Sequence, residues 1–108
     1  MKITLMRAAA CLALFGSAMA HAQTYPTKTI TMIVPFAAGG PTDTVARLVA
    51  QSMGTKLKQQ IIIENVGGAG GTIGAARAAK AAPDGYTLFL HHIGQSTAPA
   101  LYRKLPYN

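Results

Sequence analysis

Two glycine-rich stretches give this sequence its clearest capacity for chemistry. They occupy residues 36–43 and 65–72, and each lies between a strand-like segment and a helix-like segment. Glycines allow backbone N–H groups to approach an anion closely, and the N-terminus of the following helix adds partial positive charge. The stretches therefore fit either a carboxylate or phosphate site or simple tight turns, and their sequences alone favour neither.

Nucleotide-binding fingerprints do not fit these stretches. A P-loop requires a Gly-Lys pair followed by Ser or Thr, and the sequence contains no Gly-Lys pair. The dinucleotide fingerprint requires glycines at i, i+2 and i+5, but Gly68 and Gly70 are followed by Ile73 at the third position. The spacing therefore disfavours nucleotide binding, and a small phosphate- or nucleotide-binding α/β enzyme domain is kept as an alternative function.

Side chains suited to catalysis or metal binding are few. Asp43 has no second carboxylate nearby in sequence, and an acid in the first helical turn usually stabilises the helix dipole. His91 and His92 could suggest a metal, but adjacent residues of a strand point to opposite faces. We expect one of them near a ligand and the other against a helix. We expect no catalytic residue, metal or cofactor, and the scattered basic residues predict no nucleic-acid partner.

Strand-like and helix-like segments alternate around these residues. Residues 29–34 are apolar or β-branched on both faces, as expected for a strand covered by helices on both sides. Helices are expected at 41–58 and 73–82, and further strands at 60–64 and 86–90. This β-α-β-α-β order predicts an α/β fold with a parallel, three-layer unit and right-handed crossovers.

The first expected helix carries an apolar stripe. Pro41 suits its first position, and the apolar residues at helical spacing are Val45, Leu48, Val49, Met53 and Leu57. We expect this stripe to pack against the sheet. Beyond the third strand, we expect a polar loop at 91–98 and a single helical turn at 99–103.

Residues 1–22 are typical of a cleavable signal peptide. Basic residues precede an apolar run, and small residues allow cleavage after Ala20 or Ala22. The run is too short for a stable membrane anchor, and Cys11 lies inside it, which disfavours lipid attachment. Cleavage would lower the formal charge from +7 to +5, because two basic residues lie in the leader, and would remove the one cysteine. We expect an exported chain, outside the cytoplasm, that has no disulfides and attracts anions.

Motifs in one register extend through the sequence after the leader. They are Tyr-Pro-Thr-Lys-Thr-Ile at 25–30, Ile-Val-Pro-Phe-Ala-Ala-Gly-Gly-Pro-Thr-Asp at 33–43, Glu-Asn at 64–65 with the glycine-rich run at 68–75, Ala-Lys-Ala-Ala-Pro-Asp-Gly-Tyr-Thr-Leu at 79–88, and Pro-Ala-Leu-Tyr-Arg-Lys-Leu-Pro-Tyr at 99–107. Together they resemble the opening part of the Bug family, the periplasmic solute-binding receptors of tripartite tricarboxylate transporters.

The resemblance implies a two-lobed clamshell of the type II periplasmic-binding class, monomeric at full length. Such a receptor closes on a small carboxylate and delivers it to membrane permease subunits. The family pattern places the carboxylate on backbone amides of the first strand-to-helix loop, which here consists of Phe36, Ala37, Ala38, Gly39, Gly40, Pro41, Thr42 and Asp43. The next contact by position is the loop after the third strand, with Ile93, Gly94, Gln95 and Ser96.

Within that pattern, Thr42 could add a hydroxyl donor, and Asp43 is expected to order the loop or a bridging water. His91 and His92 depart from the small or apolar residues of the family pattern, which leaves the choice of ligand open. A three-stranded parallel sheet also leaves strand edges without neighbours. We therefore expect a leader at 1–22 and an incomplete N-terminal lobe at 23–108, and a truncated product without function is a further alternative.

Overall fold

The computed structural model describes residues 24–107, so the expected leader lies outside the described part of the chain. The elements follow one another as β1 (Ile30–Val34), α2 (Pro41–Leu57), β2 (Ile61–Asn65), the short 3-10 helix η1 (Ala69–Gly71), α3 (Thr72–Ala79), β3 (Thr87–Phe89) and α4 (Gly94–Leu101). The predicted β-α-β-α-β order is confirmed, and α4 extends it.

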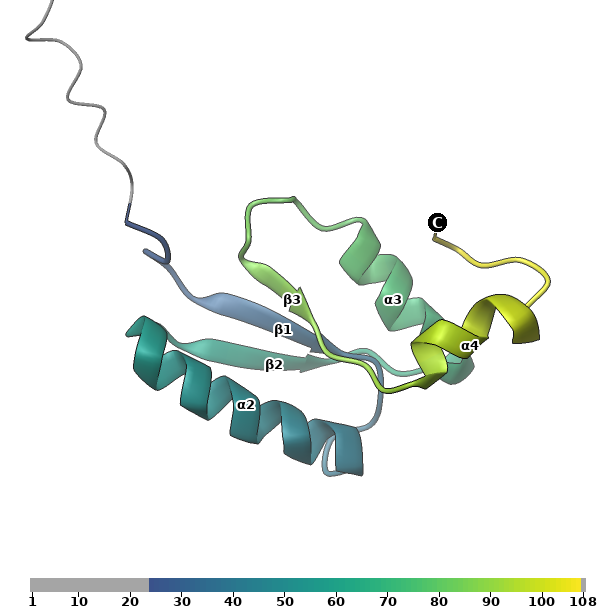
Figure 1. Ribbon diagram of the computed structural model, residues 1–108, viewed down its shortest axis with the longest axis horizontal. Helices are drawn as coiled ribbons and strands as arrows, with labels where there is room; N and C mark the ends of the chain where they lie inside the picture. Colours follow the sequence, from purple (N-terminus) through teal and green to yellow (C-terminus); the bar gives the residue numbers. More distant parts are fainter. Residues whose placement is uncertain (1–23, 108) are drawn as a thin grey trace, which may run out of the picture.

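The three strands form one parallel sheet in the order β2-β1-β3. Helix α2 packs on β1 and β2 from one face, and α3 packs on β1 and β3 from the other (Figure 1). The central strand is accordingly the core, with Ile30, Met32 and Val34 at most 2% exposed. The expected three-layer α/β unit is confirmed, and the apolar character of both faces of β1 is explained by its two covering helices.

The face of α2 that meets the sheet differs from the predicted stripe. Its buried residues are Asp43, Ala46 and Ala50, whereas Val45 is 52% and Leu48 63% exposed. The predicted placement of Val45, Leu48 and Val49 against the sheet is therefore wrong, although Met53 does pack on the core. Small alanines allow α2 to lie close to β1, and a buried carboxylate shares their face, so hydrophobicity alone gave the wrong rotation of the helix.

Two further segments differ from the sequence prediction. Helix α3 ends at Ala79, three residues before the expected end, and Lys80 is its C-cap. The expected loop at 91–98 is wrong, because α4 begins at Gly94 and continues to Leu101 with Pro99 inside it. Tyr102 then leaves the helix in an extended conformation, so the helical turn expected at 99–103 holds for residues 99–101 only.

The carboxyl ends of all three strands lie at one edge of the sheet, and α4 lies at that edge (Figure 1). The chain passes from β1 to β2 on one side and then crosses back to β3 on the other. In open α/β sheets this reversal leaves a crevice between the loops of the two strands that flank it, here β1 and β3. Within residues 24–107, no helix combines the length and the apolar run that crossing a membrane requires.

Candidate functional site

The loops that follow β1 and β3 meet at this crevice. A hollow of about 560 Å³ opens between them, lined by Phe36, Ala37, Gly40, Pro41, Thr42 and His92. Five of these six residues belong to the first loop or to the start of α2, and His92 comes from the segment after β3. The structure therefore brings most of the predicted first-loop residues to one open site at the carboxyl edge of the sheet.

Asp43, at the end of the first loop and in the first turn of α2, is buried, with only 1% of its surface exposed. Its Oδ2 accepts the Gly39 N–H at 2.8 Å and the Arg47 Nε–H at 2.8 Å. Its Oδ1 accepts from the side-chain amide of Asn65 at 2.9 Å. The carboxylate thus joins the loop, the second turn of α2 and the end of β2, so Asp43 orders the loop from beneath.

These partners favour the ionised form of the carboxyl group. Arg47 makes the largest contribution, and the hydrogen bonds from Gly39 and Asn65 add to it, so the pKa of Asp43 lies far below its usual value despite burial. The same contact raises the pKa of Arg47. A carboxylate that remains charged and fully hydrogen-bonded is a structural anchor, and its position below the loop does not suit proton transfer to a ligand in the hollow.

Asn65 is the residue whose role the sequence did not reveal. Besides bonding Asp43, its Nδ2 donates to the carbonyl of Phe36 at 3.0 Å. One amide group therefore ties the last residue of β2 to both ends of the loop after β1. The available signal was the position of an asparagine at the end of a predicted buried strand, where an amide side chain can reach a neighbouring loop.

The donors of the first loop divide into two groups. Gly39 N–H is used by Asp43, and Gly40 N–H donates to the carbonyl of Ala37 at 3.3 Å. Pro41 begins α2 and carries no N–H, and Gly40 caps the helix without a side-chain hydrogen bond. The N–H groups of Thr42 and Asp43 belong to the first turn, which has no acceptors within the helix. These amides and the helix dipole favour an anion in the hollow.

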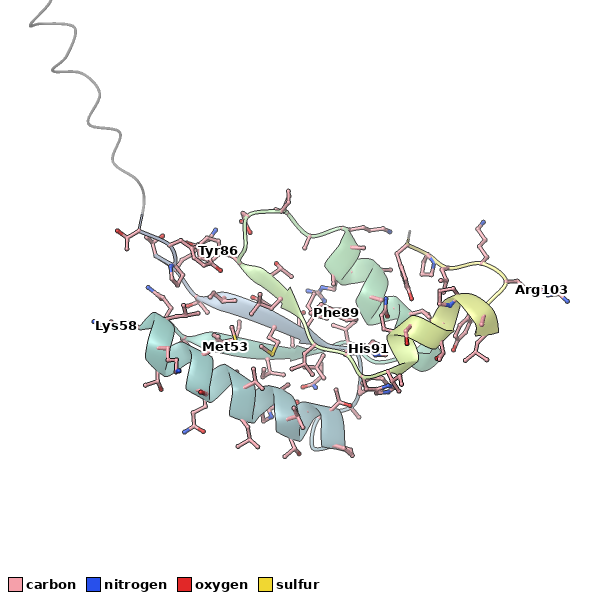
Figure 2. The ribbon with its side chains drawn as sticks, in the orientation of Figure 1. Met53, Lys58, Tyr86, Phe89, His91 and Arg103 are labelled. Carbon is pink, nitrogen blue, oxygen red and sulfur yellow. The ribbon has the colours of Figure 1, made fainter. Side chains whose placement is uncertain are left out.

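The two histidines lie beyond the end of β3, so the alternation of a strand does not separate them. Their rings are 4.7 Å apart, and both contact Phe36, with centroid distances of 5.1 Å for His91 and 4.6 Å for His92. The prediction of opposite faces is therefore wrong. Figure 2 shows His91 where β3 gives way to α4, at the other end of the sheet from Tyr86. No set of three potential metal-ligating side chains gathers anywhere in residues 24–107.

The second predicted contact segment enters α4. Ile93 is 81% exposed, Gly94 donates to the His92 ring, and the Ser96 hydroxyl donates to the carbonyl of Ile93 at 2.7 Å. Gln95 lies 3.5 Å from the hydroxyl of Tyr107. None of the four lines the hollow of the first loop, so a ligand role for Ile93, Gly94, Gln95 and Ser96 stays a prediction.

The second glycine-rich stretch is closed by neighbouring groups. A Cβ at Gly70 would collide with the Tyr102 hydroxyl, and one at Gly71 would lie 2.5 Å from Nε2 of His91. A Cβ at Gly74 would lie 2.8 Å from both Pro35 and the carbonyl of Val66. These glycines allow close packing, and the space before them is filled by the protein itself.

A larger hollow, of about 720 Å³, lies away from these loops. It lies on the α3 side of the sheet, where the ion pair between Arg77 and Glu64 forms part of its wall. Its lining includes Thr31 and Thr87 of the sheet and none of the residues of the first loop. Size alone therefore does not identify the site, because the converging donors lie at the smaller hollow.

Comparison with known proteins gives a consistent result. Residues 45–108 match the model of the family described as tripartite tricarboxylate transporter family receptor. The UPF0065 protein of the TAR-I ttuE-ttuC' intergenic region of Agrobacterium vitis is 61% identical over 90 residues, which are 82% of this chain and 26% of that protein. The chain thus spans only a minor part of the length of this relative.

Solved structures agree with the sequence matches. The periplasmic binding protein BugD superposes with a TM-score of 0.75 at 55% identity, over 78% of this chain and 28% of that one. MatC from Rhodopseudomonas palustris, solved with bound malate, superposes with a TM-score of 0.74 at 55% identity, over 78% of this chain and 29% of that one. The α/β unit described above is therefore similar to part of periplasmic binding proteins.

Proposed function

The chain belongs to the tripartite tricarboxylate transporter receptor family, and from this premise we propose that its first loop forms one side of a small-carboxylate site. In this proposal the ligand carboxylate lies at the N-terminus of α2. The single observation that carries it is the open space around Gly39. A Cβ added there would meet no atom within 4 Å, whereas one at Gly70 or Gly71 would collide with Tyr102 or His91. The malate in MatC is consistent with a dicarboxylate as ligand.

Hydrogen bonds within the first loop leave only some of its N–H groups available to a ligand. Gly39 and Gly40 use their N–H groups within the loop, so the carboxylate contacts fall to the amides of Ala37, Ala38, Thr42 and Asp43 and to the Thr42 hydroxyl. Ala37 and Ala38 are exposed, and Thr42 is half-buried beside them. Asp43 acts indirectly: its buried carboxylate orients the Gly39 turn and thereby the neighbouring amides.

The biological role follows from the same premise. We propose that residues 1–22 direct export to the periplasm and that residues 23–108 contribute part of an N-terminal lobe. A receptor containing this lobe would present carboxylates to membrane permease subunits, with no catalytic step. The alternative of a phosphate-binding enzyme domain has less support, because the space before the second glycine-rich stretch is filled by Tyr102 and His91.

Titration followed by ¹⁵N–¹H NMR tests this function on the chain itself. Malate should shift the amide signals of Ala37, Ala38 and Thr42, with a Kd on the order of 1 mM, because one loop supplies few hydrogen bonds. Thr42→Val, which keeps the shape and removes the hydroxyl, should weaken binding roughly threefold to tenfold. Thr44→Val is the matched control, since the Thr44 hydroxyl donates to the Gly40 carbonyl along the helix.

Two outcomes would contradict the proposal. Malate could leave the first-loop signals unchanged at tens of millimolar. Alternatively, inorganic phosphate or AMP could shift residues 67–71 while malate does not, which would favour the phosphate-binding alternative.

A further inference from the structure

His92 occupies an unusual position for an exposed ring. It stacks on Phe36 with a centroid distance of 4.6 Å and an interplanar angle of 19°. Its Nδ1 lies 2.9 Å from the backbone nitrogen of Gly94, which donates its N–H. The stacked neighbour and the hydrogen bond fix both the plane of the ring and its rotation within that plane.

The hydrogen bond also fixes the position of the ring proton. A ring nitrogen that accepts an N–H carries no proton itself, so the neutral imidazole holds its proton on Nε2. Nε2 is on the other side of the ring from the occupied Nδ1. The side chain therefore keeps one N–H donor that its bond to Gly94 does not use, at a residue that lines the hollow beside Thr42.

His91 provides the contrast within the same segment. Its Nδ1 lies 2.8 Å from both the backbone nitrogen and the carbonyl oxygen of His92, so a donor and an acceptor meet the same ring nitrogen. Its Nε2, however, points to Gly71 at the start of α3, and the ring packs against Phe89 with centroids 5.5 Å apart. His91 thus closes the second glycine-rich stretch, and the six residues that line the hollow do not include it.

We propose that His92 is a ligand-binding residue that donates its Nε2–H to the carboxylate held by the first loop. This inference rests on the proposed function and adds to it a side-chain donor from the segment after β3. One carboxylate oxygen would accept from the amides at the start of α2, and the other from the imidazole. Such a pair of donors favours a planar carboxylate anion over the corresponding neutral amide, whose NH₂ group cannot accept a hydrogen bond.

Two substitutions at one position separate the donor from the ring. His92→Phe keeps an aromatic ring on Phe36 but has no donor, so it should weaken malate binding about tenfold in the NMR titration. His92→Gln carries an amide NH₂ near the place of Nε2 and should recover part of that loss. His91→Phe is the control, because its ring lies outside the hollow, and its affinity for malate should stay within twofold of the original.

The tautomer is measured separately from binding. Long-range ¹⁵N–¹H spectra of the ligand-free chain should show the Nε2–H pattern for His92, and malate should shift that Nε2 signal. An Nδ1–H pattern, or unchanged malate affinity in His92→Phe, would overturn the role of His92 while leaving the first-loop site intact. If the unaltered chain does not bind malate at all, the proposed function fails, and this inference fails with it.

Discussion

The two glycine-rich loops look alike in sequence, and the structure gives them different roles. Both connect a parallel strand to a helix on the carboxyl side of the sheet. Around Gly39 the space is open, and the loop is braced from beneath by Asp43 and Asn65. Around Gly70 and Gly71 the space is taken by Tyr102 and His91. Glycine content therefore shows where backbones can approach something closely, and the surrounding atoms decide whether that is a ligand or the protein itself.

The largest expected effect comes from the Asn65 brace, by which we mean the two hydrogen bonds from the Asn65 amide to Phe36 and Asp43. Asn65→Leu removes the amide that bonds Phe36 and Asp43, and it leaves a carbonyl and a carboxylate oxygen without this donor. The free energy of unfolding should fall by about 3 kcal/mol, measured by urea denaturation. Gln51→Leu, at an exposed position on α2, should change it by less than about 0.5 kcal/mol. Equal stabilities of the two variants would show that the brace is dispensable.

A pair of glycine substitutions tests the contrast directly. Gly74→Ala places a Cβ 2.8 Å from Pro35 and from the Val66 carbonyl, and should cost about 2 kcal/mol in urea denaturation. Gly39→Ala meets no neighbour and has only the strain of a positive φ of 81°, about 1 kcal/mol. If Gly39→Ala proved the more damaging, the first loop would be a packed turn, and the contrast between the loops would disappear.

The last effect is confined to acidic solution and is absent at neutral pH. The folded pKa of Asp43 lies below its ordinary value of 3.8, so its ionisation stabilises the fold fully above that value. This stabilisation is lost as the pH falls below about 4, because the unfolded chain then binds the proton more readily.

Urea midpoints measured from pH 6 to pH 2 should therefore decrease at the acidic end. Asp43→Asn removes the titrating group, so its midpoint should depend less on pH over that range. Parallel curves for the two proteins would contradict the role assigned to the Asp43 carboxylate.

The sequence was sufficient to predict the order of the elements and the position of the first loop between β1 and α2. The apolar run of β1 and the Pro41 start of α2 are local signals, and both hold in the structure. The rotation of α2 was not predictable, because its sheet-facing side carries a buried acid whose partners come from residues 39, 47 and 65. Of these partners, Asn65 reaches Asp43 only once β2 lies beside β1.

Helix α4 was missed for a different reason. It begins at a glycine without a side-chain cap and contains Pro99, and both features usually argue against a helix. Its first turn is held instead by short-range bonds, from Gln95 N–H to the His92 carbonyl and from Ser96 N–H to the Ile93 carbonyl. The position of the His92 ring depends on the same turn, so it could not be predicted from the sequence either.

The Asn65 brace has a consequence for the order of folding. Its bonds join positions separated by only 29 and 22 residues, all within the first strand-helix-strand unit. Contacts of short sequence separation form with a low entropic penalty and early in folding. The loop geometry can therefore be complete once β2 has paired with β1, before β3 and α4 take part. During synthesis, the donors of the first loop would reach their final arrangement before the later part of the chain has been made.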